Sequence, residues 1–217
     1  MTKSNGAALL RDPFSSLSHM IFAICSLPVT AVLISLAALK ATPWHIVSYA
    51  LFGASQALLY TASGVYHALR AGERALAILK KIDHMMIFVL IAGTYTPVCL
   101  IALRGVWGFS LLAAIWTIAA AGILLKIFWM SAPRWASTLI YVAMGWSALF
   151  VFYPLVKAAT TAELALIIAG GVAYTTGAVF YALKKPVIRS WFGFHEIFHI
   201  FVMLGTTLHI IVMFMLI

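Results

Sequence analysis

The sequence is poor in charge and above all in acidic charge, since only five of its 217 residues are Asp or Glu and 9% are charged in all. Hydrophobic residues make up 65% of the chain, and the mean hydropathy is +1.08. A water-soluble domain of this size would have too little polar surface to cover its exterior. The composition therefore excludes a soluble fold and predicts an integral membrane protein in which residues 1–217 form a single domain.

Cysteine is scarce too, and the two that occur, Cys25 and Cys99, form no C-x-x-C pair. We expect both to be free thiols at packing positions. The chain also has no polar linker and no internal repeat. The net charge of +9 is spread singly over short loops, which gives no basic patch for nucleic acid, so we expect no nucleic-acid partner.

Long apolar runs are what the sequence does have. A membrane helix needs about 20 apolar residues, and the short breaks between the runs hold Pro, Gly and most of the charges. We therefore predict an all-α, seven-transmembrane helix bundle preceded by about 15 residues. The expected spans are 16–39, 46–69, 82–103, 106–127, 136–156, 162–183 and 191–217.

Lys and Arg give the predicted orientation, because these residues collect on the cytoplasmic side of membrane proteins. With the N-terminus inside, only Lys40, Arg104 and Lys157 fall outside. We therefore expect a cytoplasmic N-terminus and an external C-terminus. The inner residues are Lys3, Arg11, Arg70, Arg74, Lys80, Lys81, Lys126, Arg134, Lys184, Lys185 and Arg189.

A few ionisable residues lie inside the expected spans, where each costs about 2.5–3.5 kcal/mol and is a functional candidate. Most of them fall near the cytoplasmic ends. Polar residues also share faces of single helices, which should turn toward the bundle interior. These faces carry Gln56, Tyr60, Ser63 and His67 in one span, Asp83 and Thr94 in the next, and His195, His199, Thr206 and His209 in the last.

Three of these residues predict a metal site. His195 and His199 are spaced i, i+4 on one helix, and His67 lies at a matching depth on another. Three neutral imidazoles and one water form the open tetrahedral set of a catalytic zinc site. Asp83 could offset the charge of Zn²⁺ and accept a proton from the water, and Ser63 could hydrogen-bond the water or a substrate carbonyl.

The same segment contains H-E-x-x-H, with Glu196 after the first histidine, as in soluble zinc proteases. We find no second acidic motif to supply the usual third ligand of an intramembrane protease, which argues against that activity. A lone histidine in a helix is usually a packing residue, and we assign His45 and His84 to that class. His19 could support the metal site indirectly, and His209 could form hydrogen bonds in the cavity.

The segments "SGVYHAL", "KKIDHMMIFVLIAGTYTP" and "HEIFHIFVMLGTTLHI" occur in this order and resemble the haemolysin III branch of the progestin and adipoQ receptor family. Its wider superfamily includes the alkaline ceramidases. The resemblance covers essentially the whole chain. It implies that His67, His195 and His199 bind zinc, that Ser63 and Asp83 surround the zinc-bound water, and that Glu196 is not the base. The short N-terminal region favours a bacterial-type member in the plasma (inner) membrane.

Four functions are compatible with these residues. The first is a zinc-dependent hydrolase of a lipid amide or ester, whose substrate enters from the bilayer and whose partners are membrane lipids. The second is a non-enzymatic, zinc-stabilised lipid sensor or membrane homeostasis factor. The third is a cytolytic pore, which we do not expect because so apolar a chain without a secretion signal cannot be released in soluble form. The fourth is a haem site or proton pathway using His195, His199 and His209.

Overall fold

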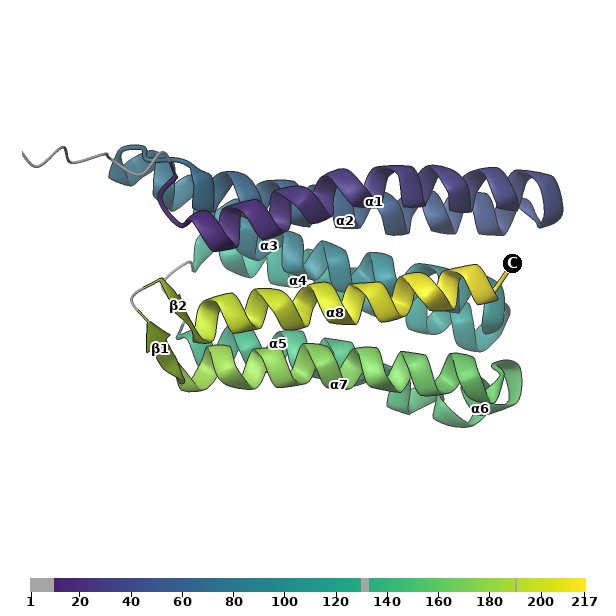
Figure 1. Cartoon of the computed structure of the whole chain (residues 1–217). Helices are drawn as coiled ribbons and strands as arrows, with labels where there is room; N and C mark the ends of the chain where they lie inside the picture. Colours follow the sequence, from purple (N-terminus) through teal and green to yellow (C-terminus); the bar gives the residue numbers. More distant parts are fainter. Residues whose placement is uncertain (1–9, 130–132, 190) are drawn as a thin grey trace, which may run out of the picture.

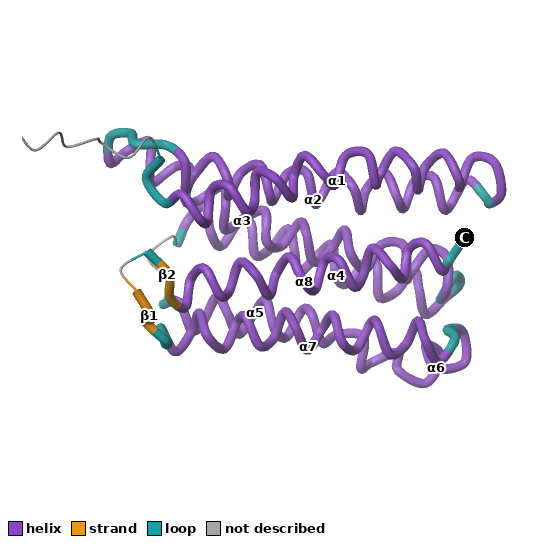
Figure 2. The backbone as a smooth tube through the Cα atoms, in the orientation of Figure 1, coloured by secondary structure: helices purple, strands orange, loops and turns teal. Residues whose placement is uncertain are grey.

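The computed structural model describes residues 10–129, 133–189 and 191–217, and most of these residues are helical; Lys3 lies outside them. Long helices run side by side in alternating directions (Figure 1), and the loops are confined to the two ends of the bundle (Figure 2). The elements are α1 (Pro13–Lys40), α2 (Pro43–Ala68), α3 (Glu73–Pro97), the π-helix η1 (Val98–Ala102), α4 (Val106–Phe128), α5 (Arg134–Gly145), the 3₁₀-helix η2 (Trp146–Val151), α6 (Phe152–Ala158), α7 (Thr161–Leu183), β1 (Val187–Arg189), β2 (Phe192–Gly193) and α8 (Phe194–Met215).

Proline and capping residues set the helix boundaries. Pro43 is the first residue of α2, a position where its missing N–H would have no helical partner. At the start of α7, the backbone N–H of Thr160 donates to the Glu163 carboxylate at 2.7 Å, and Thr160 Oγ1 accepts from the N–H of Glu163. Such caps end one helix and begin the next within a few residues, so sequential helices fold back antiparallel.

Six helical segments are long and apolar enough to cross a membrane. Large apolar side chains stay exposed along them: Leu39 is 81% exposed, Phe128 84% and Phe150 86%. Such a surface would be unfavourable in water but is compatible with lipid. The chain is therefore an integral membrane protein. The six segments are Pro13–Lys40, Glu73–Ala102, Val106–Phe128, Trp135–Ala158, Thr161–Leu183 and Phe194–Met215.

The seventh expected span, 46–69, coincides with α2. This helix has 26 residues and no Asp, Glu, Lys or Arg, yet it is not among the six. Its hydropathy is lowered by polar residues that are buried against neighbouring helices, among them Gln56, Ser63 and His67. The number of spans therefore stays a prediction, as does the orientation of the termini.

The expected start of the third span at Ile82 is wrong as a helix boundary, because α3 begins at Glu73. The segment "ERALAILKK" consists of strong helix formers, and the acidic Glu73 is favourable in the first turn. A run of apolar residues marks only the part of a helix that is suited to lipid. It therefore does not include the polar first turns of α3, which begin at Glu73.

The third long helix changes its geometry at Pro97. The regular helix ends at Pro97, and the π-helix η1 follows directly. Thr94 and Thr96 donate their hydroxyls to the carbonyls of Leu90 and Ala92, each at 2.8 Å. Hydroxyls that bond carbonyls one turn back are common in membrane helices.

The last helix, in contrast, begins later than expected, at Phe194 and not at Trp191. Before it, β1 pairs antiparallel with β2, with Val187 opposite Gly193 and Arg189 opposite Phe192. This small hairpin lies at the end of the bundle where α1 and α8 begin and α2 ends (Figure 1). It therefore fixes the position of the first turn of α8.

Candidate metal centre

Three histidines meet at this end of the bundle. His67 comes from the last turn of α2, and His195 and His199 come from the first two turns of α8. One ring nitrogen of each lies within 4.8 Å of the other two, and the Nε2 atoms of His67 and His195 are 3.1 Å apart. His67 and His199 are buried, and His195 is partly buried. The predicted ligand set is thus brought together.

Helix geometry explains the arrangement. Residues i and i+4 lie on one face of a helix, so His195 and His199 present their rings together, with centroids 4.6 Å apart. The ring of His67 completes the group at 4.9 Å from His195 and 5.0 Å from His199. Its place depends on α2 ending at the depth where α8 begins.

Asp12 holds His67 in one orientation. His67 Nδ1 donates to Asp12 Oδ2 at 3.0 Å, because an ionised carboxylate can only accept. Arg11 Nε donates to the same oxygen at 3.1 Å. Partial burial raises the pKa of Asp12, but the hydrogen bonds from His67 and Arg11 outweigh it and leave the pKa below its ordinary value. Because the proton is on Nδ1, Nε2 of His67 is unprotonated, and its lone pair is directed at the cluster.

The residues fit a metal ion. In a tetrahedral zinc site with Zn–N bonds of about 2.0–2.1 Å, ligand nitrogens lie about 3.3 Å apart, close to the spacing of the two Nε2 atoms. Among the described residues, Nδ1 of the buried His199 has no hydrogen-bond partner. Clustered imidazole lone pairs in a buried place are unfavourable unless a cation or proton satisfies them. These three residues could therefore hold a metal ion, and imidazole suits Zn, Cu, Fe and Ni.

His19 is a fourth imidazole beside the cluster. Its ring stacks on that of His199, with centroids 3.8 Å apart and an angle of 15°, and it meets Tyr60 edge-on at 4.9 Å. Among the described residues, neither nitrogen of His19 has a hydrogen-bond partner. The sequence pointed only to an indirect role for His19, since nothing in its spacing shows that α1 turns it toward α8.

Asp83 and Ser63, the two predicted reactive residues, lie beside each other in the bundle. The Ser63 hydroxyl interacts with the Asp83 carboxylate, and the two residues are 2% and 8% exposed. Both line the same cavity as His195 and His199. The cavity therefore brings the predicted acid and hydroxyl together with two of the three predicted ligands. Nothing in the sequence pointed to Asp12.

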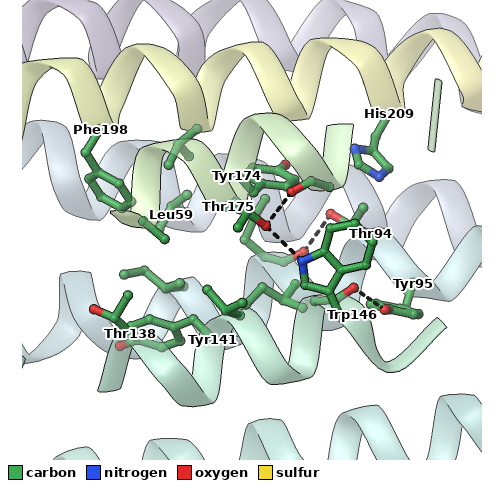
Figure 3. Close-up of a pocket in the computed structure, with 18 of the residues that line it drawn as sticks. Leu59, Thr94, Tyr95, Thr138, Tyr141, Trp146, Tyr174, Thr175, Phe198 and His209 are labelled. Atoms are coloured by element: carbon green, nitrogen blue, oxygen red, sulfur yellow. Dashed lines mark hydrogen bonds between the residues drawn. The ribbon is translucent and has the colours of Figure 1, made fainter. Parts of the chain in front are cut away.

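This cavity has a volume of about 340 Å³ and is lined mostly by apolar side chains. Thr138 and Tyr141 of α5, Tyr174 of α7 and Phe198 of α8 surround it (Figure 3). It continues past the histidines to Leu155 in α6. A long apolar space with a polar end is suited to a ligand with a hydrocarbon chain.

A group of hydroxyls crosses the middle of the bundle. Thr206 Oγ1 lies 2.6 Å from the hydroxyl of Tyr60 and 2.8 Å from that of Tyr174. His209 Nδ1 donates to the carbonyl of Gly205 at 2.8 Å, and its ring stacks on Tyr174 at 5.7 Å. His209 thus lines the cavity away from the three-histidine cluster. Trp146 Nε1 donates to Thr175 Oγ1 nearby at 2.9 Å (Figure 3).

Glu196, the acid of H-E-x-x-H, is occupied at both oxygens. Oε2 accepts from the N–H of Gly193 at 2.8 Å and caps α8, and Oε1 accepts from Ser15 Oγ at 3.2 Å. The carboxylate therefore joins the start of α8 to the start of α1. Helix capping therefore accounts for the presence of Glu196 at this position, and no role as the base of a protease is needed to explain it.

Comparisons with known proteins agree with this architecture. The family model described as "Haemolysin-III related" matches residues 7–210. The chain is 38% identical over 192 residues to the "Hemolysin-3 homolog" of Bacillus subtilis (strain 168), covering 88% of this chain and 87% of the relative. It is 39% identical over 196 residues to "Hemolysin-3" of Bacillus cereus, covering 89% and 86%. The chain therefore belongs to the haemolysin III family of membrane proteins.

Proposed function

We propose that this protein is a zinc-dependent hydrolase that cleaves an amide or ester bond of a membrane lipid. The observation that carries the proposal is the junction of a three-histidine cluster with an apolar cavity whose polar end holds Asp83 and Ser63. Ligands, a candidate base and space for a hydrocarbon chain occur in one place. The cavity falls within the range of about 300–1,000 Å³ that is typical of ligand sites.

Each residue has a role in this proposal. When bound, zinc would polarise the substrate carbonyl and lower the pKa of a water molecule. His67, His195 and His199 would hold the ion, and Asp12 would keep His67 in the correct tautomer. The Asp83 carboxylate would take the proton of the attacking water and return it to the leaving amine or alcohol as the C–N or C–O bond breaks. Ser63, whose hydroxyl donates to the Asp83 carboxylate, would accept a hydrogen bond from the attacking water and orient it.

The membrane topology belongs to the same proposal. We infer that α2 is a seventh span, because it has the length of its neighbours, no Asp, Glu, Lys or Arg, and polar residues that face inward. With the N-terminus in the cytoplasm, the histidine cluster would lie near the inner face of a bacterial plasma membrane. A lipid would then enter the cavity sideways from the bilayer, and chain 1–217 would act as one domain.

A second function is favoured by the way the cluster ties helices together. His67 and Asp12 link α2 to the start of α1, and His195 and His199 add α8. A metal there would hold three helix ends together even if no lipid were cleaved. The alternative is therefore a zinc-stabilised lipid sensor or membrane homeostasis factor without turnover.

Metal content and lipid turnover of the purified protein test both functions. We expect one zinc per chain by mass spectrometry and loss of that zinc in His67→Ala. We also expect fatty-acid release from a mixture of ceramides and phospholipids by the wild type, and none by Asp83→Asn, which should retain zinc. Zinc without fatty-acid release would favour the sensor. Release by Asp83→Asn at the wild-type rate would remove Asp83 as the base, and absence of metal would end both proposals.

A further inference from the structure

Lys126 of α4 is a cation buried inside the bundle. It is only 3% exposed, and its ammonium group donates to Ser137 Oγ of α5 at 2.5 Å. Lysine normally extends its ammonium group to water or the membrane interface, because burial of an unpaired charge is strongly unfavourable. Instead, Lys126 and Ser137 line the cavity that contains Asp83.

In the part of the chain that the structure describes, no carboxylate lies within 4.0 Å of the Lys126 ammonium group. Within the described ranges, the ion pairs closer than 4.0 Å are both made by Asp12, with Arg11 and His67. Of the other acids, Glu163 and Glu196 cap helices, Asp83 interacts with Ser63, and Glu73 is exposed. A hydroxyl is the ammonium group's hydrogen-bond partner, and it cannot offset the charge.

A second cation lies at the same end of the cavity. Lys80 of α3 lines it and is partly buried, and it is an electrostatic neighbour of both Lys126 and Asp83. Two ammonium groups that line the same end of a cavity repel each other, so an anion bound there would be stabilised by both. The hydroxyls of Ser137 and Thr138 face the same space.

The preference of basic residues for the cytoplasmic side does not explain why the side chain of Lys126 is buried. Lys81, the neighbour of Lys80, shows the ordinary arrangement: it is only partly buried and donates to the carbonyl of Ile127, near the end of α4, at 3.1 Å. A lysine that serves only topology can remain at the interface in this way. Lys126 is turned inward, where a ligand could reach it.

We propose that Lys126 and Lys80, with the hydroxyl of Ser137, form a binding site for the acidic headgroup of a lipid whose hydrocarbon chain occupies the apolar part of the cavity. The headgroup chemistry is that of a phosphate or a carboxylate, since both accept charge-assisted hydrogen bonds from ammonium groups. This inference rests on the proposed function in that the acidic lipid is the substrate of the hydrolase.

Two single-chain amphiphiles with the same acyl chain test the site: oleoyl glycerol phosphate and oleoyl glycerol. Their affinities for the purified wild type are compared with those for Lys126→Met, Lys126→Arg and the control Lys81→Met, which removes one charge on the same side. We expect the wild type to prefer the phosphate by about tenfold or more, as for hydrogen bonds to charged groups. The preference should fall toward parity in Lys126→Met and persist in Lys126→Arg and Lys81→Met.

An equal loss in Lys126→Met and Lys81→Met would overturn the proposal, since general positive charge on this side would then account for the preference. No loss in Lys126→Met would also overturn it, since the preference would not depend on Lys126. Competition with inorganic phosphate separates a lipid site from a free-anion site. We expect millimolar phosphate to leave oleoyl glycerol phosphate bound. Displacement at that concentration would assign the site to the free anion and overturn the lipid assignment. The melting temperature of each variant shows that it is folded.

This measurement does not depend on hydrolysis. The same comparison in His67→Ala should retain the phosphate preference, because Lys126 and Ser137 line the cavity and His67 does not. If the preference is present but no lipid is cleaved, the headgroup site stands and the hydrolase proposal fails. If lipids are cleaved with no dependence on Lys126, the hydrolase stands and the headgroup site fails.

Discussion

The imidazole of His67 and the carboxylate of Asp12 form a hydrogen bond of 3.0 Å across 55 residues of sequence. The bond joins the residue before α1 to the last turn of α2, and it leaves the other ring nitrogen of His67 directed at His195. A carboxylate behind a metal-binding histidine fixes the ring and increases its basicity. Asp12 is thus a positioning residue for the candidate metal centre.

Asp12→Asn should weaken metal binding without unfolding the protein. Partners of this type contribute about 10–100-fold to metal affinity, because without the carboxylate His67 is free to rotate and to change tautomer. Competition with a chelator of known affinity measures the change. Glu73→Gln, which alters an exposed acid at the same end of the bundle, is the control. Wild-type affinity in Asp12→Asn would show that the bond is not a support for the metal.

The variant His19→Phe tests whether His19 binds the metal ion or only packs beside the site. Phenylalanine preserves the stacking on His199 but removes both ring nitrogens. If the ligands are His67, His195 and His199 alone, the variant should keep one metal ion per chain, whereas His199→Phe should lose it. Elemental mass spectrometry of the two purified variants decides the matter. Loss of metal from His19→Phe would define a site of four histidines.

Glu196→Ala should affect stability and not chemistry. The variant loses the cap at Gly193 and the bond to Ser15, which together contribute about 1–2 kcal/mol. We expect a lower melting temperature, unchanged metal content and turnover close to that of the wild type, because both carboxylate oxygens bond helix ends. Glu163→Ala removes the equivalent cap from α7 and should behave alike. Loss of turnover in Glu196→Ala alone would restore it as a candidate base.

Two adjacent glycines of α7 should respond differently to alanine. A Cβ at Gly170 would overlap the imidazole of His209, whereas a Cβ at Gly171 would meet nothing within 4 Å. Gly170→Ala should therefore destabilise the protein by about 1–3 kcal/mol, the usual cost of overpacking. Gly171→Ala should leave stability close to wild type, because its methyl group extends into the cavity. Thermal unfolding in detergent distinguishes them, and equal melting temperatures would contradict the packing around His209.

The proximity of the candidate site residues could largely be predicted from local spacing. His195 and His199 share a face in any α-helix, and the polar face of α2 was expected to turn inward. The structure brings these histidines together with His67 and lines one cavity with Ser63 and Asp83, and the roles of these residues stay predictions. Boundaries were less accurate. The start of α3 was missed because its first turns are polar, and helix formation there depends on propensity and not on hydropathy.

The sequence by itself determined that this chain enters a membrane as a set of helices and that certain faces carry the polar groups. These properties follow from bilayer thickness and helical periodicity, which act along single segments. Only the tertiary structure decided that Asp12 bonds His67, that His19 stacks on His199, and that Lys126 turns inward to Ser137. Each of these contacts depends on how helices rotate and pack against one another, and that is set by the side chains of both partners at once.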